Sequence, residues 1–146
     1  MTIMTQLCFE DVQVGMEIPA LKKHPSPEQL VKWAGASGDF NVIHYSKEAA
    51  LAQGLPDVIV HGRLKSAFLS QLLTDWIGAQ GALKKIAVQH RATDTVNTDM
   101  VCKGVVKNKS AQGGENLVTL EVWTENSRGE KTCRGDAVVA LPSRGH

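Results

Sequence analysis

This sequence of 146 residues lacks long hydrophobic runs, an excess of either charge and an abundance of aromatic residues. No apolar stretch reaches the roughly 20 residues that cross a bilayer, and the first ten residues do not resemble a signal peptide. Sixteen Lys and Arg against 15 Asp and Glu give a formal net charge of +1. This balance predicts no general attraction to nucleic acid or to an acidic membrane. We therefore expect a cytoplasmic protein with neither as a partner.

Cysteine is scarce as well. Cys8, Cys102 and Cys133 are far apart and form no C-x-x-C pair, so we expect free thiols and no zinc ribbon. The five histidines form no recognised metal-binding pattern, and the chain has neither a phosphate-binding loop nor a dinucleotide fingerprint. Aromatic residues, at 5%, offer no stacking platform for single-stranded nucleic acid. These absences predict a protein that works without a metal or an organic cofactor.

Two short helices are predicted before residue 54. Ser26 and Pro27 are typical of a helix start, and Gly35 and Gly38 end this first helix. The second helix is predicted over residues 47–53, because a capping serine precedes it and a glycine follows it.

One long helix and four strands are predicted in the rest of the chain. The helix runs from His61-Gly62 to about Gly78 and is apolar over most of its circumference, as buried helices are. Alternating apolar residues and intervening turn sequences predict strands over residues 84–91, 99–107, 116–125 and 131–141. Because short turns pair consecutive strands antiparallel, we predict an α+β fold in which an antiparallel β-sheet wraps around one long central helix.

A carboxylate, an amide and an imidazole lie together in the loop between the two short helices. They belong to Asp39, Asn41 and His44. Taken alone, such residues are more often turn formers or surface residues than catalytic groups. The His61-Gly62 pair could likewise be no more than a helix start.

The combination of the two segments is more specific. Gly38-Asp39-Phe40-Asn41-Val42-Ile43-His44 and Val60-His61-Gly62-Arg63-Leu64 resemble the MaoC-like (R)-specific hydratase/dehydratase family. The motif of that family reads approximately G-D-x-N-P-x-H, with a small residue further on. The resemblance covers about residues 14–141 and implies a single hot-dog domain, which we assign to residues 1–146. It also implies reversible addition of water to 2-enoyl thioesters, giving (3R)-3-hydroxyacyl thioesters without a cofactor.

The resemblance implies a role for each residue that matches the family pattern. Asp39 and His44 match the catalytic pair that binds and activates water and moves the protons. Gly62 matches the glycine whose backbone N–H meets the thioester oxygen, as a preorganised donor at a helix N-terminus.

Supporting roles are implied for four further polar residues. Asn41 matches the asparagine of the motif, which we expect to hold the loop or polar substrate atoms in place. Ser70 aligns with a serine that supports the catalytic pair in close relatives, and Ser66 is a weaker candidate. Either serine could instead bond back to a helix carbonyl. His61 is expected to be structural and to fix the turn.

The sequence departs from the family pattern in places. Val42 replaces the usual proline of the motif, and residues 95–99 lack the proline and glycine of the family's P-V-x-x-G-D turn. Arg63 and Lys65 oppose the dipole of the helix that they begin. They either reach a solvated rim or meet an anion, such as a nucleotide phosphate or an acidic carrier surface. Arg91 is a similar candidate.

The expected substrate is a thioester of coenzyme A or of acyl carrier protein. One hot-dog unit leaves a sheet edge and a helix flank uncovered, so we expect a homodimer or a heterodimer with a related subunit. Two alternatives stay open. One is a hot-dog thioesterase, which would direct water at the thioester carbonyl. The other is a non-catalytic subunit that binds acyl thioesters within a larger dehydratase.

Overall fold

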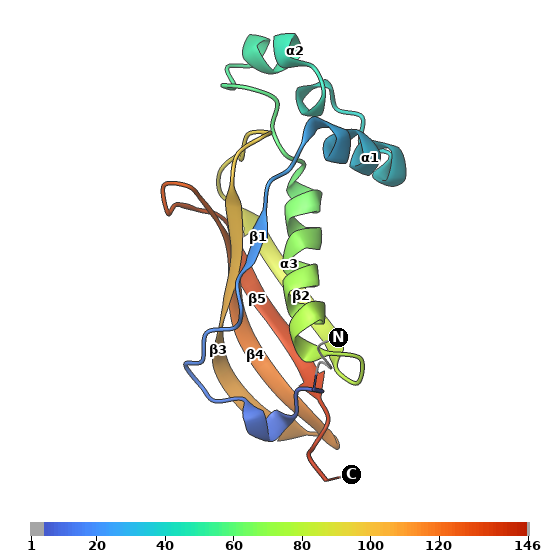
Figure 1. The fold of residues 1–146 in the computed structure, drawn as a ribbon, viewed down its shortest axis with the longest axis vertical. Coiled ribbons are helices and arrows are strands. Elements are labelled where there is room, and N and C mark those ends of the chain that lie inside the picture. Colours follow the sequence, from blue (N-terminus) through green and yellow to red (C-terminus); the bar gives the residue numbers. More distant parts are fainter. Residues whose placement is uncertain (1–4, 146) are drawn as a thin grey trace.

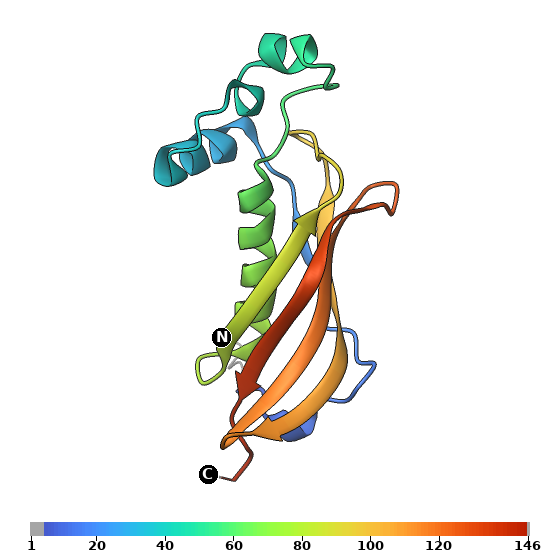
Figure 2. The same ribbon diagram turned by 180° about the vertical axis from the view of Figure 1, so that it is seen from behind.

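A five-stranded antiparallel sheet forms the body of the molecule. The computed structural model describes residues 5–145, so residues 1–4 and 146 of the predicted domain lie outside the described part. The strands, β1 (Leu21–Lys23), β2 (Ala82–His90), β3 (Met100–Gln112), β4 (Glu115–Asn126) and β5 (Lys131–Leu141), follow the order β1-β3-β4-β5-β2. Figure 1 shows the helix α3 (Gly62–Ile77) lying along this curved sheet. Figure 2 shows the sheet from behind, with β2 at its edge. The predicted α+β fold is confirmed.

Burial of α3 against the sheet makes the core. Its sheet-facing side chains are at most 4% exposed, and they are Leu64, Phe68, Leu69, Leu72, Leu73 and Ile77. Alternate residues of β4 meet them, since Val118, Leu120 and Val122 are fully buried. Each such side chain stabilises the fold by roughly 1.5–3 kcal/mol through removal from water. On the opposite flank of α3, Gln71, Thr74 and Asp75 are exposed, so no part of residues 5–145 covers them.

The short helices lie beyond the N-terminal end of α3 (Figure 1). They are α1 (Pro27–Ser37) and α2 (Lys47–Ala52), with a 3-10 turn at Val42–His44 between them. A second 3-10 turn, Phe9–Asp11, lies at the other end of the molecule. The predicted cap of α1 is confirmed, because the Ser26 hydroxyl accepts a hydrogen bond from the Gln29 N–H at 3.2 Å. Gly38 ends α1 in the left-handed conformation, at φ 78°. Gly35, also predicted to end this helix, lies within it, because a glycine lowers helix stability without breaking the hydrogen-bond ladder.

The strands confirm the four predicted segments, and β3 is longer than expected. It continues to Gln112, five residues past the predicted end, although residues 107–112 are mostly polar. Its backbone stays paired with β4 beyond a bulge, up to the turn at Gly113-Gly114. Backbone pairing therefore extends this hairpin where side-chain alternation no longer indicates a strand.

The segment after β2 is held against the start of α3 by a buried ion pair. Lys65 Nζ lies 2.9 Å from Asp94 Oδ2, and the same ammonium donates to the Ala92 carbonyl at 2.9 Å. Both side chains of the pair are 2% exposed. The predicted contact of Lys65 with a substrate phosphate or a carrier is therefore wrong, and so is the alternative of a solvated rim. Lys65 instead ties two segments of the fold together.

The turn at residues 95–99 forms although it lacks the proline and glycine of the family pattern. Asn97 adopts φ 59°, a left-handed conformation that asparagine tolerates better than most residues. The Val60 N–H donates to the Asp94 carbonyl at 2.8 Å, and the Val96 N–H donates to the Val58 carbonyl at 2.9 Å. This pairing aligns the segment that leads into His61 and α3.

Replacement of Lys65 by Met is expected to destabilise the protein strongly. It leaves the Asp94 carboxylate buried without its counter-ion, which costs about 3–5 kcal/mol and lowers Tm by roughly 10 °C. The double variant Lys65→Met/Asp94→Asn is expected to regain most of this loss. Thermal unfolding measures both. Lys84→Met, which breaks the half-exposed pair with Glu115, is the control and should change Tm little. A small Tm change in Lys65→Met would contradict the assigned role.

Candidate active site

The predicted catalytic residues meet at the N-terminal end of α3. Asp39 follows α1, His44 ends the 3-10 turn that precedes α2, and His61 caps α3. Asp39 Oδ2 lies 3.9 Å from His44 Nε2. The rings of His44 and His61 stack with centroids 3.8 Å apart and an interplanar angle of 21°. The structure therefore brings the two predicted groups together, with a second imidazole behind them.

Short-range hydrogen bonds shape the loop that carries Asp39. The Asp39 Oδ1 accepts from the Asn41 N–H, and the Asn41 Oδ1 accepts from the Ile43 N–H, each at 3.3 Å. Such turns are typical of Asp and Asn, which bond the backbone two residues ahead. Asn41 thus holds the loop in place, which is one of the two roles expected of it; the other is to hold polar substrate atoms. Asp39 Oδ2 remains directed toward His44, and the Asp39 side chain is 43% exposed.

The tautomer of His44 follows from its partner. His44 is buried, at 7% exposure, and its Nδ1 lies 2.8 Å from the Ile59 carbonyl oxygen. A carbonyl oxygen only accepts, so Nδ1 carries the proton and donates it. In the neutral ring, Nε2 is then an unprotonated acceptor. The nitrogen that faces Asp39 is therefore the one that can receive a proton from water.

His61 supports both members of the pair. Its Nε2 lies 3.3 Å from the Asp39 backbone carbonyl, to which it donates, and its ring packs on that of His44. Burial lowers the pKa of His61 below its ordinary value, and the nearby His44 lowers it further. The neutral form suits the buried Nδ1, which has no hydrogen-bond partner among residues 5–145. Beyond the structural role expected of it, His61 positions the two groups.

A single water fits the space between the two reactive atoms. The 3.9 Å separation is too long for a direct hydrogen bond between Oδ2 and Nε2. A water about 2.8 Å from each can donate one hydrogen to the carboxylate and one to the imidazole. The lone pairs of its oxygen would then point away from both. This arrangement can hold and deprotonate a water.

Gly62 begins α3 directly after His61. The first N–H groups of a helix have no partner within the helix, and the helix dipole adds partial positive charge there. The end of α3 can therefore stabilise negative charge close to the Asp39–His44 pair. Sequence reasoning missed one neighbour: the His90 ring, at the end of β2, lies against Gly62.

The two serines of α3 bond back along the helix. The Ser70 hydroxyl donates to the Ser66 carbonyl at 3.1 Å, and the Ser66 hydroxyl donates to the Gly62 carbonyl at 3.4 Å. This is the alternative that the sequence left open for both residues. Their predicted support of substrate or of the catalytic pair stays a prediction.

Two of the three candidate phosphate contacts are exposed at this end of the fold. Arg63 lies in the first turn of α3, and Arg91 follows β2 directly. Their contact with a phosphate or a carrier stays a prediction. The third candidate, Lys65, is excluded by its buried pair with Asp94.

A metal ion fits these residues poorly. Asp39, His44 and His61 each offer a ligand atom, and the three atoms lie within 4.8 Å of one another. However, an ion shared by two imidazoles needs lone pairs that converge on it. The nearly parallel stacked rings do not provide this geometry.

The cysteines are free, as predicted, and two of them are buried. Burial raises the pKa of the Cys102 thiol to about 12 and also raises the pKa of Cys133. Because a buried thiol stays protonated at neutral pH, neither is suited to act as a nucleophile.

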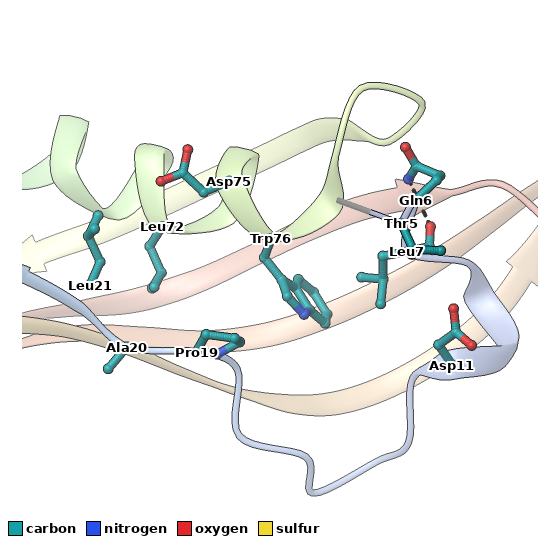
Figure 3. Close-up of a pocket in the computed structure, with 10 residues that line it drawn as sticks. All are labelled: Thr5, Gln6, Leu7, Asp11, Pro19, Ala20, Leu21, Leu72, Asp75 and Trp76. Atoms are coloured by element: carbon teal, nitrogen blue, oxygen red, sulfur yellow. Dashed lines mark hydrogen bonds between the residues drawn. The ribbon is translucent and has the colours of Figure 1, made fainter. Parts of the chain in front are cut away.

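A cavity of about 480 Å³ lies at the other end of α3 (Figure 3). Leu21, Leu72 and Trp76 contribute to its apolar lining, and Asp75 lies at its side. Leu72 is ten residues after Gly62, which corresponds to about 15 Å along a helix. The cavity therefore does not include the Asp39–His44 pair.

Acidification should weaken the fold through His61. Because its pKa is lowered by folding, the unfolded chain binds the proton more readily. The stability from neutral His61 is present above about pH 6.5 and is lost as the pH falls toward the lower folded pKa. Urea unfolding at pH 7.5 and 5.5 is expected to show a smaller loss for His61→Gln than for the wild type. Equal losses would contradict this contribution.

Comparisons with known proteins agree with this fold. A (R)-specific enoyl-CoA hydratase from Rhodospirillum rubrum is 29% identical over 142 residues, covering 94% of this chain and 93% of the relative. A 3-oxo-4,17-pregnadiene-20-carboxyl-CoA hydratase beta subunit from Mycobacterium tuberculosis is 29% identical over 121 residues, covering 80% and 88%. A chain of the ChsH1-ChsH2 complex from Mycobacterium tuberculosis superposes with a TM-score of 0.78, at 25% identity, covering 88% and 98%.

Residues 10–126 match the family model of the MaoC-like domain. Among the helices of residues 5–145, none combines the length and apolarity needed to span a membrane. The match confirms the resemblance found in the two sequence segments and, with the structural similarity, the hot-dog fold that it implied. The chain belongs to the family of MaoC-like domains.

Proposed function

We propose that this protein is an acyl hydratase/dehydratase. It adds water reversibly to 2-enoyl thioesters and gives (3R)-3-hydroxyacyl thioesters. The observation that carries this proposal is the 3.9 Å separation of Asp39 Oδ2 and His44 Nε2 at the N-terminus of a buried helix. The name of the Rhodospirillum rubrum relative, a (R)-specific enoyl-CoA hydratase, supports the same reaction.

The pair acts on one bound water. Asp39 and His44 each accept a hydrogen bond from it, which leaves its oxygen free to attack the β-carbon of the enoyl group. As the C–O bond forms, His44 Nε2 takes one proton from the water, and the Asp39–His44 pair then gives a proton to the α-carbon and returns to its starting state. The double bond thus gains the hydrogen and hydroxyl of one water. The reverse sequence removes them.

Negative charge moves to the thioester oxygen during this addition. The Gly62 N–H at the start of α3 is the proposed donor to that oxygen. The donor belongs to a helix that is buried along the sheet, so it is fixed before the substrate arrives. Its stabilisation is therefore available without rearrangement of the backbone.

The acyl group is carried by coenzyme A or by acyl carrier protein. Both carriers have a phosphate at the far end of the arm that bears the thioester, and Arg63 and Arg91 are exposed at this end of the fold. We propose them as the contacts with that phosphate. The region of residues 1–146 acts as one hot-dog unit.

We also propose that two hot-dog units pair in the active protein. The nine-residue strand β2 is at the edge of the sheet, and one flank of α3 is exposed. An unpaired edge of this length favours association with another strand. A relative is named as a beta subunit, and a similar structure is a complex of two proteins, which supports pairing with a related chain. Because this chain carries both Asp39 and His44, it is the active subunit of either a homodimer or a heterodimer.

Hydration of crotonyl-CoA tests the catalytic pair. Wild-type protein is expected to remove the enoyl-thioester absorbance and to form the (3R)-hydroxyacyl product. Asp39→Asn and His44→Ala should each lower kcat by at least about 10²-fold, because each removes a group that handles the water or its protons.

The matched control is Asp99→Asn, which removes an exposed carboxylate paired with His24 and should keep wild-type activity. Release of free coenzyme A without hydration would indicate a thioesterase instead. Tight binding of acyl-CoA without turnover, even with a related subunit added, would indicate a non-catalytic subunit. Unchanged activity in both site variants would sink the assigned roles.

The pairing predicts a solution mass of about twice the 15.8 kDa chain, or of this chain plus a related subunit. Light scattering at the concentration of the assay measures it. A monomer that gains turnover only when a related subunit is added would indicate a heterodimer. Full activity in a monomer would contradict the pairing.

A further inference from the structure

The surroundings of Gly62 contain an imidazole that the mechanism has not used. A Cβ placed on Gly62 would lie 3.2 Å from His90 Nε2 and 3.3 Å from Cδ2 and Cε1 of the same ring. These distances are closer than ordinary van der Waals contact. The His90 ring therefore occupies the space beside the α-carbon of Gly62, and its Nε2 edge is the nearest part.

The position of His90 leaves its side chain accessible to a ligand. It is the last residue of the edge strand β2 and is exposed, and β5 flanks it on one side only. None of the hydrogen bonds found within residues 5–145 uses its ring nitrogens. Its side chain thus has an unused N–H next to the start of α3.

The spacing allows His90 and Gly62 to reach the same atom. A Cβ lies about 2.5 Å from the nitrogen of its own residue by covalent geometry, so His90 Nε2 is at most roughly 6 Å from the Gly62 nitrogen. Two N–H donors that each lie about 2.9 Å from one oxygen are separated by up to about 5.8 Å. Both donors therefore fit around a single oxygen.

We propose that His90 donates a second hydrogen bond to the thioester oxygen, opposite the backbone N–H of Gly62. This inference rests on the proposed hydration of enoyl thioesters. In that reaction the oxygen gains negative charge as water attacks the β-carbon. Two donors that strengthen together at this stage stabilise the transition state more than the bound substrate.

The charges around His90 favour a neutral donor. Its partial burial lowers the pKa of His90, and the nearby ammonium of Lys65 lowers it further. Asp94 neutralises much of that ammonium, and Arg91 adds a positive charge beside His90 in the sequence. A neutral imidazole keeps one N–H, which can donate a hydrogen bond to an enolate oxygen. This N–H is a weaker acid than that of a protonated imidazole.

Steady-state hydration of crotonyl-CoA by His90→Ala and His90→Gln tests the proposal. Loss of one donor to a developing oxyanion is expected to lower kcat by about 10²-fold in His90→Ala, with KM nearly unchanged. His90→Gln places an amide N–H at a similar reach and should recover most of the activity. Asp99→Asn, which changes an exposed carboxylate paired with His24, is again the control.

The outcomes separate this inference from the proposed function. Wild-type activity in His90→Ala, together with loss of activity in Asp39→Asn, would overturn the His90 donor and leave the hydratase in place. A rise in KM alone, or a His90→Gln variant as slow as His90→Ala, would also overturn the donor. Absence of turnover in the wild type, with and without a related subunit, would overturn both. Because His90 is exposed, its variants should fold normally, which Tm verifies.

Discussion

The burial of α3 against the curved sheet is the interaction on which the rest of the structure depends. Its apolar side chains fill the space above β3, β4 and β5, so the helix can neither slide nor rotate without exposing them. This fixes where its N-terminus lies. The N–H groups of the first turn then face the loop that carries Asp39 and His44, at the end of the sheet rather than in its core. The fixed position of this helix end therefore determines where the residues of the site lie relative to it.

Polar groups next to that helix end are arranged so that few charges are buried without partners. His44 donates to a backbone carbonyl, and His61 remains neutral because it is buried. The ammonium of Lys65 is matched by Asp94. The Asp39 side chain, at 43% exposure, keeps contact with solvent beside the imidazole. The site therefore combines one solvated carboxylate with one buried imidazole, a pairing suited to holding water.

Much of the fold was predictable because its signals are local. The serine caps of the short helices and the glycine after α1 act within a few residues, and the alternation of β4 is a property of one strand. The limits of local signals are also visible. Gly35 lies inside a helix that it was expected to end, and β3 runs through polar residues that only pairing with β4 identifies as a strand.

The sequence by itself determined the order of the elements, the central helix and the proximity of Asp39 to His44, because these depend on residues near one another in the chain. Only the tertiary structure decided the partners of Lys65, the stacking of His61 on His44 and the contact of His90 with Gly62. Lys65 and Asp94 are 29 residues apart, and His90 is 28 residues after Gly62. Such contacts are set by how β2 and the following segment pack against the start of α3. No pattern within either segment carries that information, which is why a lysine in the first turn of a helix could be mistaken for a surface cation.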